Sequence, residues 1–254
     1  IMYTNKTVII TGAASGMGRA MAQAFLDAGA NVVVNARKAE DFIEFLADNT
    51  ERHAQIKTVI GDIGHQSTGQ ALAQAALDTF GTIDVLINNA GAFVPKPFLE
   101  ETEANLDAYY ATTVKGSYFS AQAVIPTMQT QQDGVIINIG SMWVENPLEA
   151  TPASASQVMK GAMHTLTRHL AIEFAKDNIR VNTIAPAIIE TPLYDNLMDK
   201  EALAGLAKLH PLRKLGNLDV IIAWAKHLSG QGGRFVTGQT HFVDGGINSG
   251  SHLI

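Results

Sequence analysis

The sequence predicts one α/β domain over residues 1–254, a doubly wound parallel sheet with helices on both faces. Short runs rich in Val and Ile alternate with helical patterns along the chain. A chain of 254 residues with 46% hydrophobic content can bury one full core. No linker, repeat or low-complexity segment divides the sequence. Together these observations favour a single folding unit.

The elements follow in a regular order. Apolar runs typical of buried parallel strands lie at residues 8–10, 32–34, 58–60, 85–87, 135–137 and 181–184. Helical patterns lie between them at residues 19–28, 39–49, 68–79, 103–122 and 155–176. Right-handed crossovers put the helices on both faces of such a sheet. The ligand crevice is then expected beyond the carboxyl ends of the strands, where the strand order reverses.

Composition excludes several classes of function. The 24 acidic residues outnumber the 18 Lys and Arg, which argues against a nucleic-acid partner. No apolar run approaches the roughly 20 residues of a membrane span, and the first residues lack the apolar core of a signal peptide. The absence of cysteine excludes disulfides and thiolate catalysis. We therefore expect a cytoplasmic protein without a membrane partner.

The eight histidines do not form a metal-binding motif. His164 and His169 share one predicted helix but are five residues apart, not the four that put two ligands on one face. We interpret both as surface or interface residues and expect no metal site.

A glycine-rich turn follows the first strand and precedes the first helix. It reads Thr11-Gly12-Ala13-Ala14-Ser15-Gly16-Met17-Gly18. Glycines let backbone approach a phosphate closely, because no Cβ intervenes. The helix N-terminus adds free N–H groups and the positive end of a dipole. This turn predicts a nucleotide-phosphate site.

The end of the second strand bears on which nucleotide binds. The chain there reads Asn35-Ala36-Arg37-Lys38, with no carboxylate before Glu40. A carboxylate at this place would bind the ribose hydroxyls of NAD, whereas an arginine offers a two-pronged donor to a 2′-phosphate. NADP(H) is favoured, NAD(H) stays open, and the alternative is that Arg37 and Lys38 are simply solvated.

Three later features complete a family pattern. Asn88-Asn89-Ala90-Gly91 follows the fourth strand, Ser141 ends the fifth, and Lys160 lies in a long helix. With the T-G-x-x-x-G-x-G turn, they make the chain resemble the short-chain dehydrogenase/reductase family over nearly its whole length. The resemblance implies a Rossmann-type fold and an NAD(P)(H)-dependent oxidoreductase. Its substrate would be a small carbonyl or alcohol compound.

The resemblance also implies the cofactor-binding residues. In the family an aspartate lies near the adenine, the N-N-A-G turn walls the cofactor site, and a threonine binds the nicotinamide carboxamide. Ala187 stands where the family usually has a glycine after the proline. The residues carried over are Gly12, Ser15, Gly16, Met17, Gly18, Arg37, Asp62, Ile63, Asn89, Ala90, Gly91, Lys160, Pro186 and Thr191.

The catalytic half of the pattern is altered. The family uses an asparagine, a serine, a tyrosine and a lysine, and Ser141 and Lys160 match two of them. Ser156 occupies the tyrosine position, four residues before Lys160, and Thr113 occupies the asparagine position. A phenol has a pKa of about 10 that a nearby ammonium lowers, whereas an aliphatic hydroxyl is shorter and less acidic. General acid–base catalysis contributes ~10²–10⁴-fold, so we expect weak activity.

Three interpretations remain open. The chain is an NADP(H)-dependent oxidoreductase weakened by the serine, or an enzyme in which Ser141, Ser156 and Lys160 arrange a water. The third is a non-catalytic NADP(H)-binding protein of the same fold.

Two further expectations concern the surroundings of the site. Residues 187–215, rich in proline, are expected to form a substrate lid, and an apolar pocket or plain core would include Trp143, Leu148, Leu193, Tyr194 and Leu197. The helix at residues 155–176 is apolar on more than one face, which is typical of a buried helix. In the family it packs against its own copy, so a homotetramer or dimer is expected.

Overall fold

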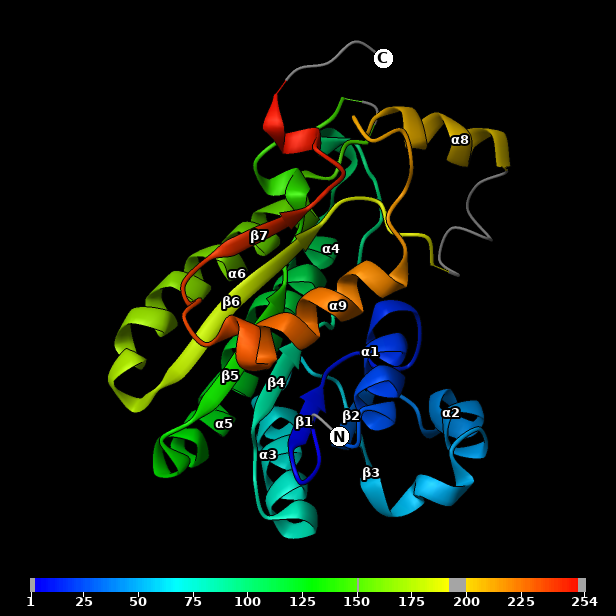
Figure 1. Cartoon of the computed structure of the whole chain (residues 1–254). Helices are drawn as coiled ribbons and strands as arrows, with labels where there is room; N and C mark the ends of the chain where they lie inside the picture. The colour runs from blue at the N-terminus through cyan, green and yellow to red at the C-terminus, as the bar shows by residue number, and fades with distance from the viewer. Residues whose placement is uncertain (1–2, 150, 192–199, 251–254) are drawn as a thin grey trace.

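The computed structural model describes residues 3–149, 151–191 and 200–250. Seven parallel strands form one sheet in the order β3-β2-β1-β4-β5-β6-β7 (Figure 1). The strands are β1 Thr7–Ile10, β2 Asn31–Ala36, β3 Ile56–Ile60, β4 Val85–Asn88, β5 Gly134–Ile139, β6 Ile179–Pro186 and β7 Thr240–Val243. The strand order reverses between β1 and β4, so the predicted doubly wound fold is confirmed.

Helices cover both faces of this sheet. On one face lie α1 (Gly16–Asp27), α2 (Ile43–Ala47) and α9 (Leu218–Ser229). On the other lie α3 (Gln66–Phe80), α5 (Gly116–Gln131) and α6 (Ser154–Glu173). The remaining α-helices are α4 (Glu103–Tyr109) and α8 (Lys200–Lys208). Short 3₁₀ turns are η1 Ala39–Phe42, η2 Thr50–Gln55, η3 Phe98–Glu100, η5 Met142–Val144, η6 Ala175–Asp177, η7 Gln231–Gly233 and η8 Ile247–Ser249.

The core explains why the strands read as continuous apolar runs. Val8 and Ile10 point into the cluster beneath α1 and α9, whereas Ile9 between them points into the cluster beneath α3 and α5. Side chains alternate between the two faces of a strand, and here both faces are covered by helices. Every position of β1 must therefore be apolar or satisfied internally.

Two predicted helices differ from the observed ones. The predicted helix at 39–49 is the 3₁₀ turn η1 followed by the short α2, which bury Phe42 and Phe45 respectively. The predicted helix at 103–122 continues to Gln131 but is interrupted by the π-helical turn η4 (Tyr110–Lys115). A π-helical turn inserts a residue into the helical repeat, which apolar periodicity does not report.

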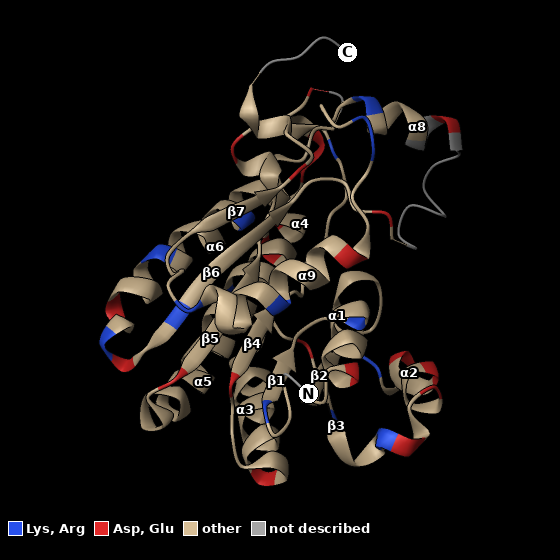
Figure 2. Ribbon diagram, in the orientation of Figure 1, with Lys and Arg blue, Asp and Glu red and all other residues tan. Residues whose placement is uncertain are grey.

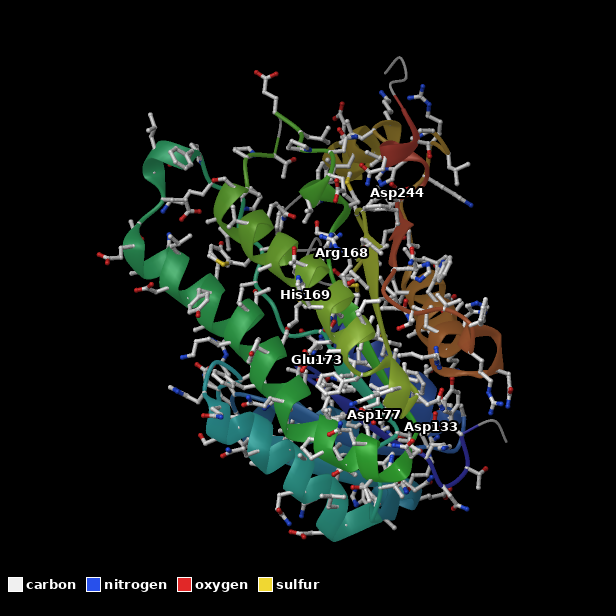
Figure 3. All side chains as sticks on the ribbon, turned by 90° about the vertical axis from the view of Figure 1, so that its left-hand side faces the viewer. Asp133, Arg168, His169, Glu173, Asp177 and Asp244 are labelled. Carbon is white, nitrogen blue, oxygen red and sulfur yellow. The ribbon has the colours of Figure 1, made fainter. Side chains whose placement is uncertain are left out.

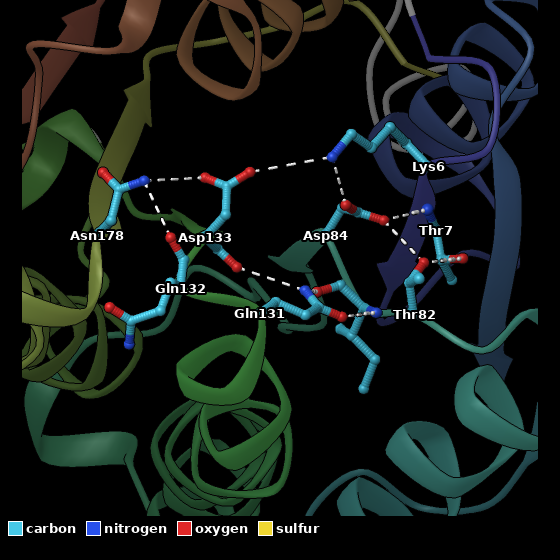
Figure 4. A network of polar contacts seen from close by, with 9 residues as sticks. Lys6, Thr7, Thr82, Asp84, Gln131, Gln132, Asp133 and Asn178 are labelled. Atoms are coloured by element: carbon cyan, nitrogen blue, oxygen red, sulfur yellow. Dashed lines mark hydrogen bonds and ion pairs between the residues drawn. The ribbon is translucent and has the colours of Figure 1, made fainter.

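Polar side chains join the amino ends of the central strands (Figure 4). Lys6, Asp84, Asp133 and Asn178 immediately precede β1, β4, β5 and β6. Lys6 Nζ lies 2.7 Å from Asp84 Oδ1, and Asp84 Oδ2 accepts a hydrogen bond from the Thr7 amide at 2.8 Å. Asn178 Nδ2 donates to Asp133 Oδ1 at 3.3 Å. This amino-edge network holds the strands on the side away from the expected ligand crevice.

The surface carries charges of both signs. Figure 2 shows Lys and Arg interspersed with Asp and Glu over helices and loops. Within the described ranges, no helix is long and apolar enough to cross a membrane.

Candidate active site

The glycine-rich turn packs tightly against the loop that follows β4. Gly12 has a φ of +63°, and a Cβ there would lie 2.8 Å from the Ala90 Cα. A Cβ on Gly18 would collide with the Gly12 carbonyl and with the Asn89 amide. Glycine is therefore required at both positions by conformation and by close approach.

Asn89 joins the two loops into one unit. Its Nδ2 donates hydrogen bonds to the carbonyl oxygens of Thr11 and Gly12, each at 3.0 Å. The backbone amides of Asn89 and Ala90 both donate to Thr11 Oγ1 at 3.1 Å. These contacts lie where β1 and β4 are neighbours, at the switch point of the strand order.

The other predicted cofactor residues surround this unit. Helix α1 begins directly at Gly16, and Ser15, at its N-cap position, makes no side-chain capping bond. Arg37 is exposed just beyond β2 and forms no ion pair with any residue of the described ranges. Asp62 Oδ1 accepts a hydrogen bond from the Gly64 amide at 2.8 Å, and Ile63 is buried. Asp62 thus shapes the loop before α3.

A pocket of about 200 Å³ opens beyond the carboxyl ends of β1, β4, β5 and β6. Its lining brings together many of the predicted site residues and several others. They are Met17, Asn89, Gly91, Ala92, Phe93, Ile139, Gly140, Ser141, Trp143, Ser156, Gln157, Lys160, Pro186, Ala187, Ile189 and Thr191.

Ser141 lies where β5 passes into η5. Its Oγ accepts a hydrogen bond from the Trp143 amide at 3.2 Å, which fixes the hydroxyl oxygen at the pocket wall. A hydroxyl has one hydrogen and two lone pairs. The hydrogen of Ser141 therefore remains available to a ligand oxygen.

Ser156 is turned toward its own helix. Its Oγ donates to the Ala153 carbonyl at 3.1 Å and accepts from Gln157 Nε2 at 3.3 Å. The only hydrogen of the hydroxyl is thereby used within the first turn of α6. In this arrangement Ser156 presents no proton to the pocket.

Lys160 reaches back across the end of β5. Its Nζ donates to the Ile139 carbonyl at 2.5 Å, and a Cβ on Gly91 would lie 3.2 Å from this nitrogen. Burial lowers the pKa of Lys160 to about 8. The amine is thus enclosed by backbone and lies in the wall shared with Ser141.

A buried chain of hydrogen bonds seats α6 on the sheet. Asn88 Nδ2 donates to Asn138 Oδ1 at 2.9 Å, and Asn138 Nδ2 donates to Thr167 Oγ1 at 2.8 Å. Thr167 Oγ1 lies 2.7 Å from Thr183 Oγ1, so β4, β5, β6 and α6 are joined. Because buried polar groups are costly when unpaired, these bonds fix the position of the helix.

The interpretation of His164 as a surface or interface residue is wrong. Its side chain is 3% exposed, and Nε2 accepts a hydrogen bond from the Ser141 amide at 3.4 Å. Burial, and then the charges of Lys160 and Arg168, lower the pKa of His164 to about 4. Gly140 makes room for the ring, since a Cβ there would collide with it. The glycine directly before Ser141 is the sequence feature that could have indicated a buried ring at this place.

Other predicted residues lie apart from the pocket. Thr113 is buried in the turn η4 and is not among the residues that line it. Trp143 lines the pocket and Leu148 does not, whereas Leu193, Tyr194 and Leu197 lie outside the described residues. Sequence reasoning missed Phe93 and Gln157, which carry no motif of their own.

The chain belongs to the short-chain dehydrogenase/reductase family. The family model described as "Enoyl-(Acyl carrier protein) reductase" matches residues 12–248. A curated relative, the BbsD subunit of a hydroxy(phenyl)methylsuccinyl-CoA dehydrogenase from Thauera aromatica, is 34% identical over 95% of this chain and 96% of its own.

Two solved structures are similar to this chain in fold and, more distantly, in sequence. A gluconate 5-dehydrogenase from Burkholderia cenocepacia J2315, in complex with NADP and tartrate, is 29% identical with a TM-score of 0.88 over 98% of both chains. The L-sorbose reductase from Gluconobacter frateurii, with NADPH and L-sorbose, is 27% identical with a TM-score of 0.90, over 98% of this chain and 99% of its own.

The buried histidine predicts a pH-dependent stability. The pKa of His164 is about 4 in the folded chain, below its ordinary value, so the unfolded chain binds the proton more readily. Stability from this group is present above about pH 6.5 and is lost as the pH falls toward 4, by about 2 to 3 kcal/mol.

In urea denaturation at pH 7.5 and 4.5, His164→Gln should show a smaller loss of stability on acidification than the unchanged protein. His65→Gln, at an exposed histidine, is the matched control and should keep the full loss. Equal losses in all three proteins would contradict the assignment.

Proposed function

We propose that this protein is an NADP(H)-dependent oxidoreductase that exchanges hydride with the carbonyl or alcohol carbon of a small molecule. One observation carries the proposal: Ser141, Lys160 and Thr191 line a single pocket beside the glycine-rich turn. This is the place where doubly wound sheets bind ligands. Membership of the short-chain dehydrogenase/reductase family supports the same reaction class.

The phosphate-binding part of the site fits NADP(H). The turn at Gly12 and Gly18 puts no side chain between backbone and ligand, and the α1 N-terminus supplies unpaired N–H groups. Arg37 stands free beyond β2 for the 2′-phosphate. The neighbours crystallised with NADP and NADPH support this choice over NAD(H).

In the reacting part of the site, we assign one role to each side chain. When bound, NADPH supplies the hydride. Ser141 donates its free hydrogen to the substrate oxygen, and Lys160 holds the cofactor ribose. Ser156 occupies the acid–base position and Thr113 the asparagine position, but the Ser156 hydrogen goes to the Ala153 carbonyl. We infer that Ser156 supplies none of the ~10²–10⁴-fold that acid–base catalysis contributes.

The orientation of Ser156 also favours a second candidate. A non-catalytic NADP(H)-binding protein of the same fold would keep the glycine-rich turn and need no proton donor. Cofactor binding without turnover on any carbonyl compound would distinguish it from the oxidoreductase.

We also propose that the chain is one domain with a substrate lid at residues 187–215. Ile189 and Thr191 line the pocket at the start of this segment. Its two ends are joined where the Glu190 amide donates to the Gly216 carbonyl at 2.8 Å. A segment tied at its base in this way is placed to cover the pocket; residues 192–199 lie outside the described ranges.

We further propose a cytoplasmic homotetramer or dimer, with the outer face of α6 against a second copy. Val158 and Ile172 on this helix are exposed in the single chain, at 64% and 80%. Figure 3 shows the same helix with Arg168, His169 and Glu173 labelled along it. Exposed apolar side chains beside polar ones are typical of an interface. Light scattering that shows a monomer would contradict this proposal.

The exposed arginine after β2 predicts which cofactor is preferred. Arg37→Ala should weaken NADPH binding about 10- to 100-fold, because charge-assisted hydrogen bonds to the 2′-phosphate are lost. NADH binding should be unchanged. Fluorescence titration measures both constants, and Lys57→Ala, at an exposed position in β3, is the control. Equal weakening of both cofactors would contradict the role of Arg37.

Restoring a phenol should raise the rate. Ser156→Tyr is expected to increase kcat for carbonyl reduction, by at most the ~10²–10⁴-fold that acid–base catalysis contributes, while NADPH affinity stays the same. Ser156→Phe has the size without the hydroxyl and should give no gain. NADPH oxidation across a panel of carbonyl compounds measures the effect. If the two variants behave alike while binding NADPH, the assignment of position 156 is wrong.

A further inference from the structure

We propose that Lys160 itself is the proton donor and acceptor of this enzyme, in the role that position 156 has in its family. Its ammonium gives a proton to the substrate oxygen during reduction, and its amine takes one during oxidation. The inference rests on the proposed oxidoreductase function and changes which side chain carries the proton.

Neither serine of the pocket can supply the proton. The Ser156 hydrogen is directed at the Ala153 carbonyl, and one lone pair of its oxygen is taken by Gln157. Ser141 has a free hydrogen, but an aliphatic hydroxyl is too weak an acid to release it near neutral pH. Ser141 therefore orients the substrate oxygen and leaves the proton to another group.

Lys160 lies where it can contact a ligand in the pocket. Its Nζ lies in the pocket wall and donates one hydrogen to the Ile139 carbonyl. An ammonium has three hydrogens, so two remain for a ligand. Gly91 and Ser156 line the same pocket, and a Cβ on Gly91 would lie 3.2 Å from Lys160 Nζ, so the absence of a side chain there leaves this nitrogen uncovered.

Lys160 can also change its charge near neutral pH. Burial is the cause that lowers its pKa to about 8, and no carboxylate of the described ranges forms an ion pair with it. On α6 the titratable neighbour is His164, which responds to the charge of Lys160. From α4, Tyr109 packs against Ala155 and Met159 on the same helix.

Carbonyl reduction needs one hydride and one proton, and each has a source. As hydride from bound NADPH reaches the carbonyl carbon, an N–H bond of the Lys160 ammonium breaks and the O–H bond of the alcohol forms. The neutral amine then recovers a proton from solvent. Alcohol oxidation runs these steps in reverse.

The deciding experiment separates a proton donor from a fixed positive charge. Lys160→Arg keeps the charge, but a guanidinium does not lose its proton in proteins. It should lower kcat for carbonyl reduction about 100-fold or more while NADPH still binds in a fluorescence titration. Lys176→Arg, at an exposed lysine of η6, is the matched control and should keep full activity. Retained activity in Lys160→Arg would overturn the inference and leave the oxidoreductase proposal intact.

Two further measurements use signals that a structural role would not produce. In reduction, kcat/KM should be constant below pH about 8 and fall tenfold per pH unit above it. In oxidation it should rise up to the same pH. Lys160→Ala should regain activity when ethylamine is added, because a free amine replaces the missing one. Failure of ethylamine to restore activity, together with a kcat/KM that shows no change near pH 8, would overturn the inference.

A direct titration keeps this inference separable from the proposed function. In the ¹⁵N-lysine NMR spectrum of the protein with NADPH, the signal absent from Lys160→Arg should titrate near pH 8. A value near the ordinary ~10.4 of lysine would overturn the inference alone. Turnover by Ser156→Tyr but not by the unchanged protein would also overturn it. If NADPH does not bind at all, the proposed function fails as well.

Discussion

The docking of α6 on the sheet is the constraint on which the whole site depends. The hydrogen bonds from Asn138 through Thr167 to Thr183 leave no freedom for the helix to rotate or slide, because any shift would strand buried polar groups. Lys160 lies two turns before Thr167 on the same helix, so the same hydrogen bonds fix its position. The strand end that carries Ser141 is held by the same contacts. These hydrogen bonds thus hold the helix and the strand at a fixed distance from each other.

Much of the fold followed from the sequence because its signals are local. The alternation of apolar runs with helical patterns predicts the sheet, and the glycine spacing from Gly12 to Gly18 predicts the phosphate turn. The π-helical turn η4 was not predicted, since apolar periodicity does not report one residue inserted into a helix. His164 was missed for another reason. Its burial depends on Gly140, a residue distant in sequence that leaves space for the ring.

The two halves of the site are carried by different elements. The cofactor side consists of the β1 turn and the loop after β4, joined by Asn89. The reacting side consists of the end of β5 and the first turns of α6. A substitution at position 156 therefore leaves the hydrogen bonds between Asn89 and the glycine-rich turn in place.

The amino-edge network has a consequence for how such a chain changes over time. Lys6, Asp84, Asp133 and Asn178 anchor the strands at the edge of the sheet that faces away from the pocket (Figure 4). Substitutions among the residues that line the pocket leave these contacts in place. The residues around the pocket can therefore vary while the contacts at the other end of the strands continue to stabilise the fold.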